Sequence, residues 1–497
     1  MSRSHWVSFS VVAATAALVG CGGGDGSPGS SSSPSAAPSA VATAAPRPRA
    51  PAADPRVEAY LTSRYRPEAV RHTFTSATGD TIDCVDFAEE PGVREMLSRG
   101  ETVDGLLASL HASEAAHAAS HPPSAARLDR GDAHFDGLSD ALGARRACPE
   151  RTVPHARLTA EKIEGAGGLD AYLAHRAAEH VKTPADTHAV EPDVQPGSGG
   201  FYTENPPYAH VFAVQHAAAN GAVNGGIATM TITDDFPSSF VNHSTNHTLQ
   251  QIWIIGGTGS GTQTLEAGSK FSADIGGPYL WVGGTQDDYK DFCENGSKAW
   301  GTTTCVTWVP NPSATLALGQ TLPASTPGGV QHELTLDVEL YCWLRSGFPN
   351  LQLSCNWDVS AGVDGAALTY LGYFAESGYN GGALALGKAT VFETGGEVRD
   401  DSNNFTEVEM GEQPMLIGLA SYGHTAYVRN FGYYSNLCIA LLGGCQPQLV
   451  QTGATVYYTN GKFTYNTGAA AGSPSWTNWF YYGDFVPLMI PIVPLGG

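Results

Sequence analysis

Apolar residues in the second half of the chain occur in short blocks that are rich in aromatic and β-branched side chains. The blocks lie at residues 208–217, 227–233, 304–309, 334–344, 351–359, 368–374, 426–434 and 454–459. Gly, Asn, Ser and Pro separate them, and the 3.6-residue period of an amphipathic helix is almost absent. The pattern predicts many short strands and, for residues 208–497, an antiparallel β-sandwich.

One predicted hairpin, TLQQIWIIGGTGSGTQTLEAGSK at residues 248–270, carries a candidate functional acid. Residues 250–255 predict a buried strand, the glycines after them a turn, and residues 263–271 a returning strand. Glu266 and Lys270 are the only charged residues in this stretch. A solvated strand face would carry more charge, so Glu266 needs an explanation, although a surface or edge glutamate also fits the spacing.

The first half of the chain predicts a smaller unit with both helices and strands. Asp54 and Pro55 form an N-cap and a first-turn proline, which predicts a helix at the start of the folded chain. Helices are also predicted at residues 103–120 and 168–181, and a strand near residues 73–86. The protein is therefore expected to be mainly β, with a small α+β domain at residues 54–190 in front of the sandwich.

Stretches without large apolar side chains separate these units from each other and from the N-terminus. Residues 1–20 combine Arg3 with an apolar run and resemble a bacterial lipoprotein signal peptide, so Cys21 is predicted to be lipidated. An ordinary signal peptide with an incidental cysteine is the alternative. Residues 21–53 predict a disordered tether and residues 191–207 a linker. The protein is expected to be exported, and either anchored by lipid at the bacterial outer membrane or cell surface, or extracellular after processing.

Charge and cysteine content narrow the partners and the compartment. The 497-residue chain has 26 Lys and Arg against 48 Asp and Glu, a net charge of −22 that would repel nucleic acid. Of nine cysteines, all but Cys21 form an even set that predicts disulfides in an exported chain. Short loops favour the pairs Cys293 with Cys305, Cys342 with Cys355, Cys438 with Cys445, and, across the N-terminal unit, Cys84 with Cys148. None has the CxxC spacing of a structural zinc site, and no metal site is predicted.

Two stretches around glutamates form recognisable motifs. One is Gln251-Ile252-Trp253-Ile254 followed by Leu265-Glu266-Ala267-Gly268, and the other is Thr394-Gly395-Gly396-Glu397-Val398. They resemble the Q-I-W, I-E-x-G-W and W-G-G-E-V motifs of the neprosin family of glutamic peptidases. The resemblance implies that Glu266 and Glu397 are two catalytic acids on a β-sandwich, with no cofactor. Glu393 is the alternative second acid, and the sequence does not decide which glutamate is the base.

Further motifs extend the resemblance over almost the whole chain after the tether. Residues 79–86, GDTIDCVD, and 148–154, CPERTVP, are similar to the neprosin activation domain, with Glu-Arg where the family has glycine. Residues 54–190 are therefore expected to be a pro-domain that inhibits the enzyme intramolecularly, and an accessory domain that only packs beside it is the alternative. Ten of the sixteen histidines precede residue 190, which suggests that acid charges this segment and loosens it.

Aromatic residues near the two acids also match the family. Tyr279-Leu280-Trp281 and Asp288-Tyr289 are similar to its Y-W-T-x-D-x-Y motif. With Trp253, the aromatic members of these motifs are candidate substrate-binding residues, although packing in a core is a more frequent use of such side chains.

Two positions depart from the family pattern. Ser269 and Thr394 stand where the family has tryptophans beside the acids. Both are expected to reshape the pocket that selects proline, and Thr394 is a candidate substrate contact.

Two carboxylates that face one water can hydrolyse an amide if one is ionised and the other protonated. The sequence therefore predicts a glutamic endopeptidase, made as a self-masked zymogen, that cuts peptide or protein substrates after proline at acid pH. Paired carboxylates also serve glycoside hydrolases, and a sandwich can bind carbohydrate or peptide without catalysis, so these are the alternative functions.

Overall fold

The computed structural model describes residues 54–64, 66–120, 148–178, 200–201, 207–219, 221–234, 246–272, 277–298, 306–345, 352–401, 408–411, 415–416, 422–436, 438–439, 448–458, 463–467, 472 and 476–486. All of them belong to one compact unit of the chain, Ala53–Gly497. The predicted signal peptide, Cys21, the tether and most of the linker lie outside these residues. Over the described ranges, no helix has the length and apolar character needed to span a bilayer.

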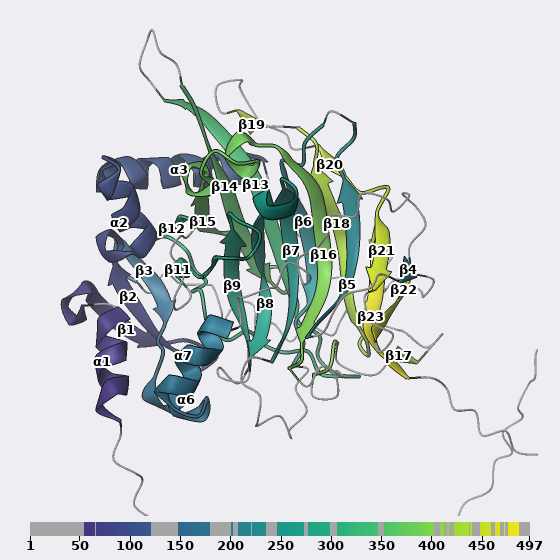
Figure 1. Ribbon diagram of the computed structural model, residues 1–497, viewed down its shortest axis with the longest axis horizontal. Coiled ribbons are helices and arrows are strands. Elements are labelled where there is room, and N and C mark those ends of the chain that lie inside the picture. The colour runs from purple at the N-terminus through teal and green to yellow at the C-terminus, as the bar shows by residue number, and fades with distance from the viewer. Residues whose placement is uncertain are drawn as a thin grey trace, which may run out of the picture. The chain divides into compact units, whose positions relative to one another are not determined.

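Helices and a small antiparallel sheet form the N-terminal unit, by which we mean the described residues between 54 and 178 (Figure 1). Its elements are α1 (Pro55–Arg64), η1 (Pro67–Ala69), β1 (Val70–Thr75), β2 (Thr81–Asp86), η2 (Phe87–Glu89), α2 (Pro91–Ser98), α3 (Val103–Ser120), β3 (Thr152–Ala156), α6 (Ala160–Gly165) and α7 (Leu169–Ala178). The first helix starts where the sequence predicted, and the Asp54 carboxylate accepts a hydrogen bond from the Arg56 N–H.

The first of two large sheets contains the predicted hairpin. Its strands, in spatial order, are β11 (Ser297–Lys298), β10 (Phe292–Glu294), β9 (Gly277–Thr285), β8 (Gln263–Ser272), β7 (His247–Gly256), β16 (Ala389–Arg399), β5 (Tyr208–His216), β21 (Thr455–Tyr458) and β4 (Gly200–Phe201). The turn η3 (Gly259–Gly261) joins β7 to β8, as the glycines predicted. Strand β4 comes from the stretch predicted to be linker and pairs in parallel with β21.

The second large sheet follows the order β12 (Trp308–Pro310), β15 (Thr369–Ala375), β14 (Gln352–Val363), β13 (Glu333–Arg345), β6 (Gly225–Thr231), β18 (Ala426–Tyr434), β23 (Trp479–Val486) and β17 (Met415–Leu416). Strands β19 (Cys438–Ile439), β20 (Leu449–Val450) and β22 (Phe463–Asn466) pair with β13, β18 and β23. The turns η4 (Glu376–Tyr379) and η5 (Leu384–Leu386) lead from β15 to β16.

Alternate residues of the two sheets meet in one apolar core. Ile252 and Ile254 of β7 and Leu336 and Val338 of β13 belong to the same buried cluster. Side chains two apart on a strand point the same way, so each sheet gives one apolar face to this core. The predicted fold class, an antiparallel β-sandwich preceded by a small α+β region, is confirmed.

The N-terminal unit shares a second apolar core with the sandwich. Phe87, Val93 and Leu110 pack in one buried cluster with Tyr370 and Tyr373 of β15. Figure 1 shows α2 and α3 beside β12 and β15, which they contact. The apolar faces of these helices are therefore covered by the sandwich itself.

Polar contacts join the same two parts. The Asp80 carboxylate accepts hydrogen bonds from the Thr321 backbone N–H at 2.8 Å and from its hydroxyl at 3.0 Å. The backbone N–H of Ala156 donates to the carbonyl of Leu318. Gly92 of α2 lies so close to β12 that a Cβ there would be 1.8 Å from the Trp308 carbonyl oxygen.

Disulfides confirm part of the cysteine prediction. Cys84 is joined to Cys148 within the N-terminal unit, and Cys342 to Cys355 across the paired strands β13 and β14. Cys293 is also disulfide-bonded. Its predicted partner Cys305, and the pairing of Cys438 with Cys445, lie outside the residues whose side chains are described.

Substitution of Gly92 tests the contact between α2 and β12. We expect Gly92→Ala to lower the free energy of unfolding by about 1–3 kcal/mol, because the new methyl group overlaps backbone atoms that cannot move alone. Gly165→Ala in α6 is the matched control, since nothing lies within 4 Å of its Cβ position. Equal thermal stability of the two variants would show that the close contact at Gly92 is absent in solution.

Candidate active site

The register of β7 with its two neighbours decides which side chains share a face. Trp253 of β7 is opposite Glu266 on β8 and Glu393 on β16, and Leu249 is opposite Glu397 on β16. Residues that are directly opposite, or two apart on one strand, point to the same side of a sheet. The three glutamates therefore share one face, turned away from the core between the sheets. We call it the carboxylate face.

Hydroxyl groups contact Glu266, which is 2% exposed. The Tyr289 hydroxyl donates to its Oε1 at 2.5 Å, and the Thr264 hydroxyl donates to the same oxygen at 2.8 Å. Burial, and then the charge of Glu266, raise the pKa of Tyr289 well above its usual value. Tyr289 therefore remains a proton donor to Glu266 throughout the neutral and acid range.

Two imidazoles contact Glu397, which is also 2% exposed. Nε2 of His210, on β5, lies 2.7 Å from Oε2, and Nε2 of His247, on β7, lies 3.3 Å from Oε1. Both rings are buried. An ionised carboxylate only accepts hydrogen bonds, so each Nε2 carries a proton when Glu397 is charged. A charged imidazole at this distance further favours the ionised form of Glu397.

The sequence did not identify His210 or His247 as partners of Glu397. They lie 187 and 150 positions from it along the chain, and no spacing motif links them. The one usable signal was that His210 occupies a polar position inside an apolar strand, where a buried imidazole needs a partner.

Glu266 and Glu397 act on the same phenol. The charge of Glu397 also raises the pKa of Tyr289, although burial and Glu266 contribute more. The pKa of Tyr379 is also raised, first by burial and then by the charge of Glu266. Glu397 does not contribute to that shift. Tyr289, one of the predicted substrate-binding residues, thus lies within electrostatic reach of both acids.

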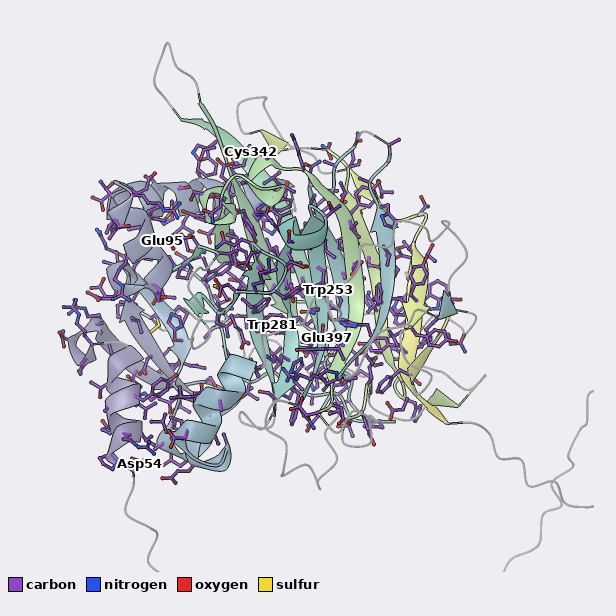
Figure 2. The ribbon with its side chains drawn as sticks, viewed as in Figure 1. Asp54, Glu95, Trp253, Trp281, Cys342 and Glu397 are labelled. Atoms are coloured by element: carbon purple, nitrogen blue, oxygen red, sulfur yellow. A yellow bond between two sulfur atoms is a disulfide. The ribbon has the colours of Figure 1, made fainter. Side chains whose placement is uncertain are left out.

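Three other predicted substrate-binding residues also lie on the carboxylate face. Trp253, Tyr279 and Trp281 are buried in one aromatic cluster with Tyr289. Figure 2 shows Trp253 close to Glu397 over the middle strands of the first sheet. Trp281, on β9, is three strands from Glu397 and lies diagonal to Glu266 on β8. The fold therefore gathers these aromatic side chains around the acids.

A buried ion pair supports this cluster. Lys270 Nζ lies 3.1 Å from a carboxylate oxygen of Glu294 and 5.7 Å from the centre of the Trp281 ring. The Tyr279 hydroxyl donates to the other oxygen of Glu294 at 3.3 Å. Lys270 is opposite Leu249, in the same row of the sheet as Glu397, so a fixed positive charge belongs to the carboxylate face.

Thr394 and Ser269 were expected beside the acids, but both lie on the opposite face of the first sheet. Thr394 is opposite Ile252 and Ala213, which face the core between the sheets, and its hydroxyl donates to the Gln251 carbonyl. Ser269 is on the core side as well, and its hydroxyl donates to the Gln250 side chain. The expectation that both reshape the pocket beside the acids is wrong, because each is one position out of phase with the glutamates.

Glu393, the alternative second acid, shares the carboxylate face and is 6% exposed. It lies in the same row as Glu266, with the Trp253 indole between them. The two imidazoles contact Glu397, and the pKa of Tyr289 responds to Glu397 and not to Glu393. The surroundings therefore favour Glu397 over Glu393 as the second acid.

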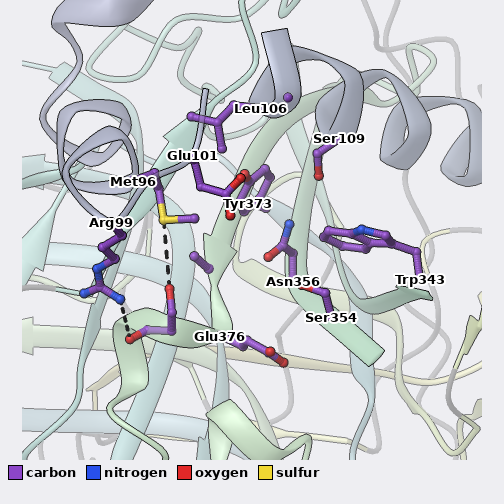
Figure 3. Close-up of a pocket in the computed structure, with 13 residues that line it drawn as sticks. Met96, Arg99, Glu101, Leu106, Ser109, Trp343, Ser354, Asn356, Tyr373 and Glu376 are labelled. Carbon is purple, nitrogen blue, oxygen red and sulfur yellow. Dashed lines mark hydrogen bonds between the residues drawn. The ribbon is translucent and has the colours of Figure 1, made fainter. Parts of the chain in front are cut away.

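A separate cavity of about 700 Å³ lies where the N-terminal unit meets the second sheet. Figure 3 shows Arg99, Glu101 and Leu106 of the N-terminal unit facing Asn356 and Tyr373 of the sandwich. None of the predicted site residues lines this cavity. In the part of the chain that the structure describes, no three His, Cys, Asp or Glu side chains are grouped as metal ligands.

A comparison with protein families agrees with the motifs. Residues 244–484 match the family model described as Neprosin. Among solved structures, the crystal structure of scytalido-glutamic peptidase with a transition state analog inhibitor is similar over 56% of this chain and 98% of that chain, with 9% identity and a TM-score of 0.25. The family match includes β7, β8 and β16, the strands that carry the candidate acids. Residues 244–484 thus form a domain of the neprosin family, and the protein is a peptidase.

Proposed function

We propose that this peptidase is a glutamic endopeptidase in which Glu397 is the general base and Glu266 the general acid. The observation that carries the proposal is the contrast between their surroundings on one buried face. Two imidazoles contact Glu397 and favour its ionised form, whereas hydroxyls and aromatic rings surround Glu266. Two acids with different surroundings can hold one proton between them, as acid–base catalysis requires.

The reaction follows from these roles. Glu397 takes a proton from water, and the water oxygen attacks the carbonyl carbon of the peptide bond. The carbon–nitrogen bond then breaks, and the leaving nitrogen takes the proton from Glu266. Tyr289 holds Oε1 of Glu266 through its hydroxyl, so it positions the acid.

The finer features of the function are also proposals. Cleavage after proline is supported by the motifs around both acids, and the aromatic side chains Trp253, Trp281 and Tyr289 offer flat apolar surfaces for a proline ring. Export with lipid anchoring at Cys21, or release after processing, is supported by the signal-like residues 1–20.

Autoinhibition by the N-terminal unit is proposed from its motifs, and the described contacts of its helices are with β12 and β15 of the second sheet. The hypothesis that acid loosens this unit through its histidines meets an opposing effect. Two buried carboxyls of the second sheet hold their protons in the docked state even near neutral pH, so acid favours the docked state through them.

These carboxyls are Glu339 of β13 and Asp358 of β14, both nearly inaccessible. Burial, with the neighbouring charges of Asp337 and Asp358, raises the pKa of Glu339 to about 9. Burial raises the pKa of Asp358 to about 8, against a hydrogen bond donated by the Tyr370 hydroxyl. Ser113 of α3 lies against Asp358 and Tyr370, so the docked helix helps to exclude water.

Replacement of each acid tests the proposed function. We expect Glu266→Gln and Glu397→Gln each to lower kcat by about 10²–10⁴, because each removes one proton-transfer group. Glu393→Gln, on the same face, is the control and should change kcat by less than about threefold. Cleavage of a proline-containing peptide and of a glucan at acid pH is the measurement.

Two results would count against the proposal. Loss of peptide cleavage in Glu393→Gln with activity kept in Glu397→Gln would move the second role to Glu393. Glucan hydrolysis that depends on the same glutamates would support a glycoside hydrolase.

The pH dependence tests the contact between the histidines and Glu397. A charged imidazole favours the ionised base, so we expect His210→Gln to move the acid limb of the pH–kcat profile to higher pH by about 1 unit. Glutamine keeps a hydrogen-bond donor but carries no charge. His332→Gln is the control, because His332 is buried against Asp364, distant in sequence from the acids. An unchanged acid limb in His210→Gln would remove the proposed electrostatic role.

The buried carboxyls predict how stability depends on pH. The pKa values of Glu339 and Asp358 are higher in the folded than in the unfolded state. Their contribution to the free energy of unfolding is therefore complete below about pH 4 and is lost as pH rises through 8 to 9. We expect Asp358→Asn to raise the free energy of unfolding by about 1–3 kcal/mol at pH 9, with little gain at pH 4. Asp104→Asn, at an 86% exposed side chain of α3, is the control. Thermal melts that give one pH-independent difference would contradict the assignment.

A further inference from the structure

Gln251 of β7 lies midway between the two proposed acids. It is opposite Gly268 on β8 and Gly395 on β16, so it is diagonal to Glu266 on one side and to Glu397 on the other. Diagonal neighbours on one face are about 7–8 Å apart. The Gln251 side chain therefore occupies the middle of the space that a peptide bond must enter to reach both acids.

The side chain of Gln251 has an unused hydrogen-bonding capacity. It is 0% exposed, and neither Nε2 nor Oε1 has a hydrogen-bond partner within the described part of the chain. Leaving a buried amide without hydrogen bonds destabilises a folded protein, so such a side chain needs a reason. The adjacent Gln250, which faces the core, donates to Thr233 and accepts from Ser269. The two glutamines thus differ in this respect although they are neighbours in the chain.

Glycines are the two residues directly opposite Gln251 on the neighbouring strands. A Cβ at Gly268 would be 2.1 Å from the Gln250 carbonyl oxygen, and one at Gly395 would be 2.1 Å from the Val211 carbonyl oxygen. Neither position can carry a side chain without moving the backbone, so the two residues directly opposite Gln251 leave its amide without a side-chain partner. Trp281, in the same row, also has a buried indole N–H without a hydrogen-bond partner in the described residues.

We propose, resting on the function proposed above, that Gln251 binds the carbonyl oxygen of the scissile peptide bond and stabilises the oxyanion. When the water oxygen forms its bond to the carbonyl carbon, the π electrons move to the carbonyl oxygen. The Nε2–H of Gln251 donates to that oxygen, while the proton of the water goes to Glu397. When the carbon–nitrogen bond breaks, the electron pair returns to form the carbonyl and Glu266 protonates the nitrogen. A preorganised donor in a buried site acts strongly at this step.

The test is the variant Gln251→Met in the full chain, assayed on a proline-containing peptide after acid incubation. Methionine has a similar volume but no donor, so we expect kcat to fall by about 10²–10³ with KM changed by less than about threefold. Affinity for a phosphinic peptide, a tetrahedral analogue, should fall by a similar factor. The melting temperature should not fall, because the substitution removes an unpaired buried amide.

The pH profile and a neighbouring variant separate this role from a structural one. Glutamine does not titrate, so the shape of the pH–kcat profile should be that of the wild type. Gln250→Met, which removes a paired core amide, should lower the melting temperature with a smaller effect on kcat. If Gln251→Met does not fold, Gln251→Asn provides the same comparison with a displaced donor.

The outcomes distinguish this inference from the proposed function. Wild-type kcat in Gln251→Met, with Glu266→Gln and Glu397→Gln inactive, overturns the role of Gln251 and leaves the two acids in place. A rise in KM with kcat unchanged also overturns it, since the donor would then act on the ground state. Full activity in both glutamate variants would instead overturn the proposed function.

Discussion

The pairing of β7 with β8 on one side and β16 on the other is the constraint on which the rest of the site depends. The two candidate acids are 131 positions apart in the sequence, 397 minus 266, and they share a face because the same strand aligns both. Side-chain direction alternates along a strand, so a slip of one residue in either pairing would turn one acid into the apolar core. The buried aliphatic residues on the other face of β7 oppose such a slip.

The same alignment separates the surroundings of the two acids. Glu397 lies beside β5, which brings His210 against it, while Glu266 lies beside the β9–β10 connection, which brings Tyr289. The register places the acids two diagonal steps of about 7–8 Å apart. In the proposed mechanism, different neighbours, and not repulsion between touching carboxylates, would therefore keep one acid charged and the other protonated.

The N-terminal unit is attached through an interior that it shares with the second sheet. Its helices cover Tyr370 and Tyr373 and lie over carboxyls whose protonated form is favoured by burial. Removing this unit would expose an apolar face and let those carboxyls ionise. Attachment of the unit and the protonation of Glu339 and Asp358 are thus one linked equilibrium.

The sequence determined many of the strands, the β7–β8 hairpin and the fold class, because each depends on local alternation or glycine turns. It also pointed to two disulfides, of which Cys342–Cys355 closes a short loop and Cys84–Cys148 a long one. Motifs in the sequence also pointed to Glu266 and Glu397. It could not place Thr394 and Ser269, since the face of a side chain depends on register as well as on neighbouring residues. Nor could it find His210, His247 or Gln251 as parts of the site. Their relation to the acids exists only across paired strands, where residues far apart in the chain become neighbours.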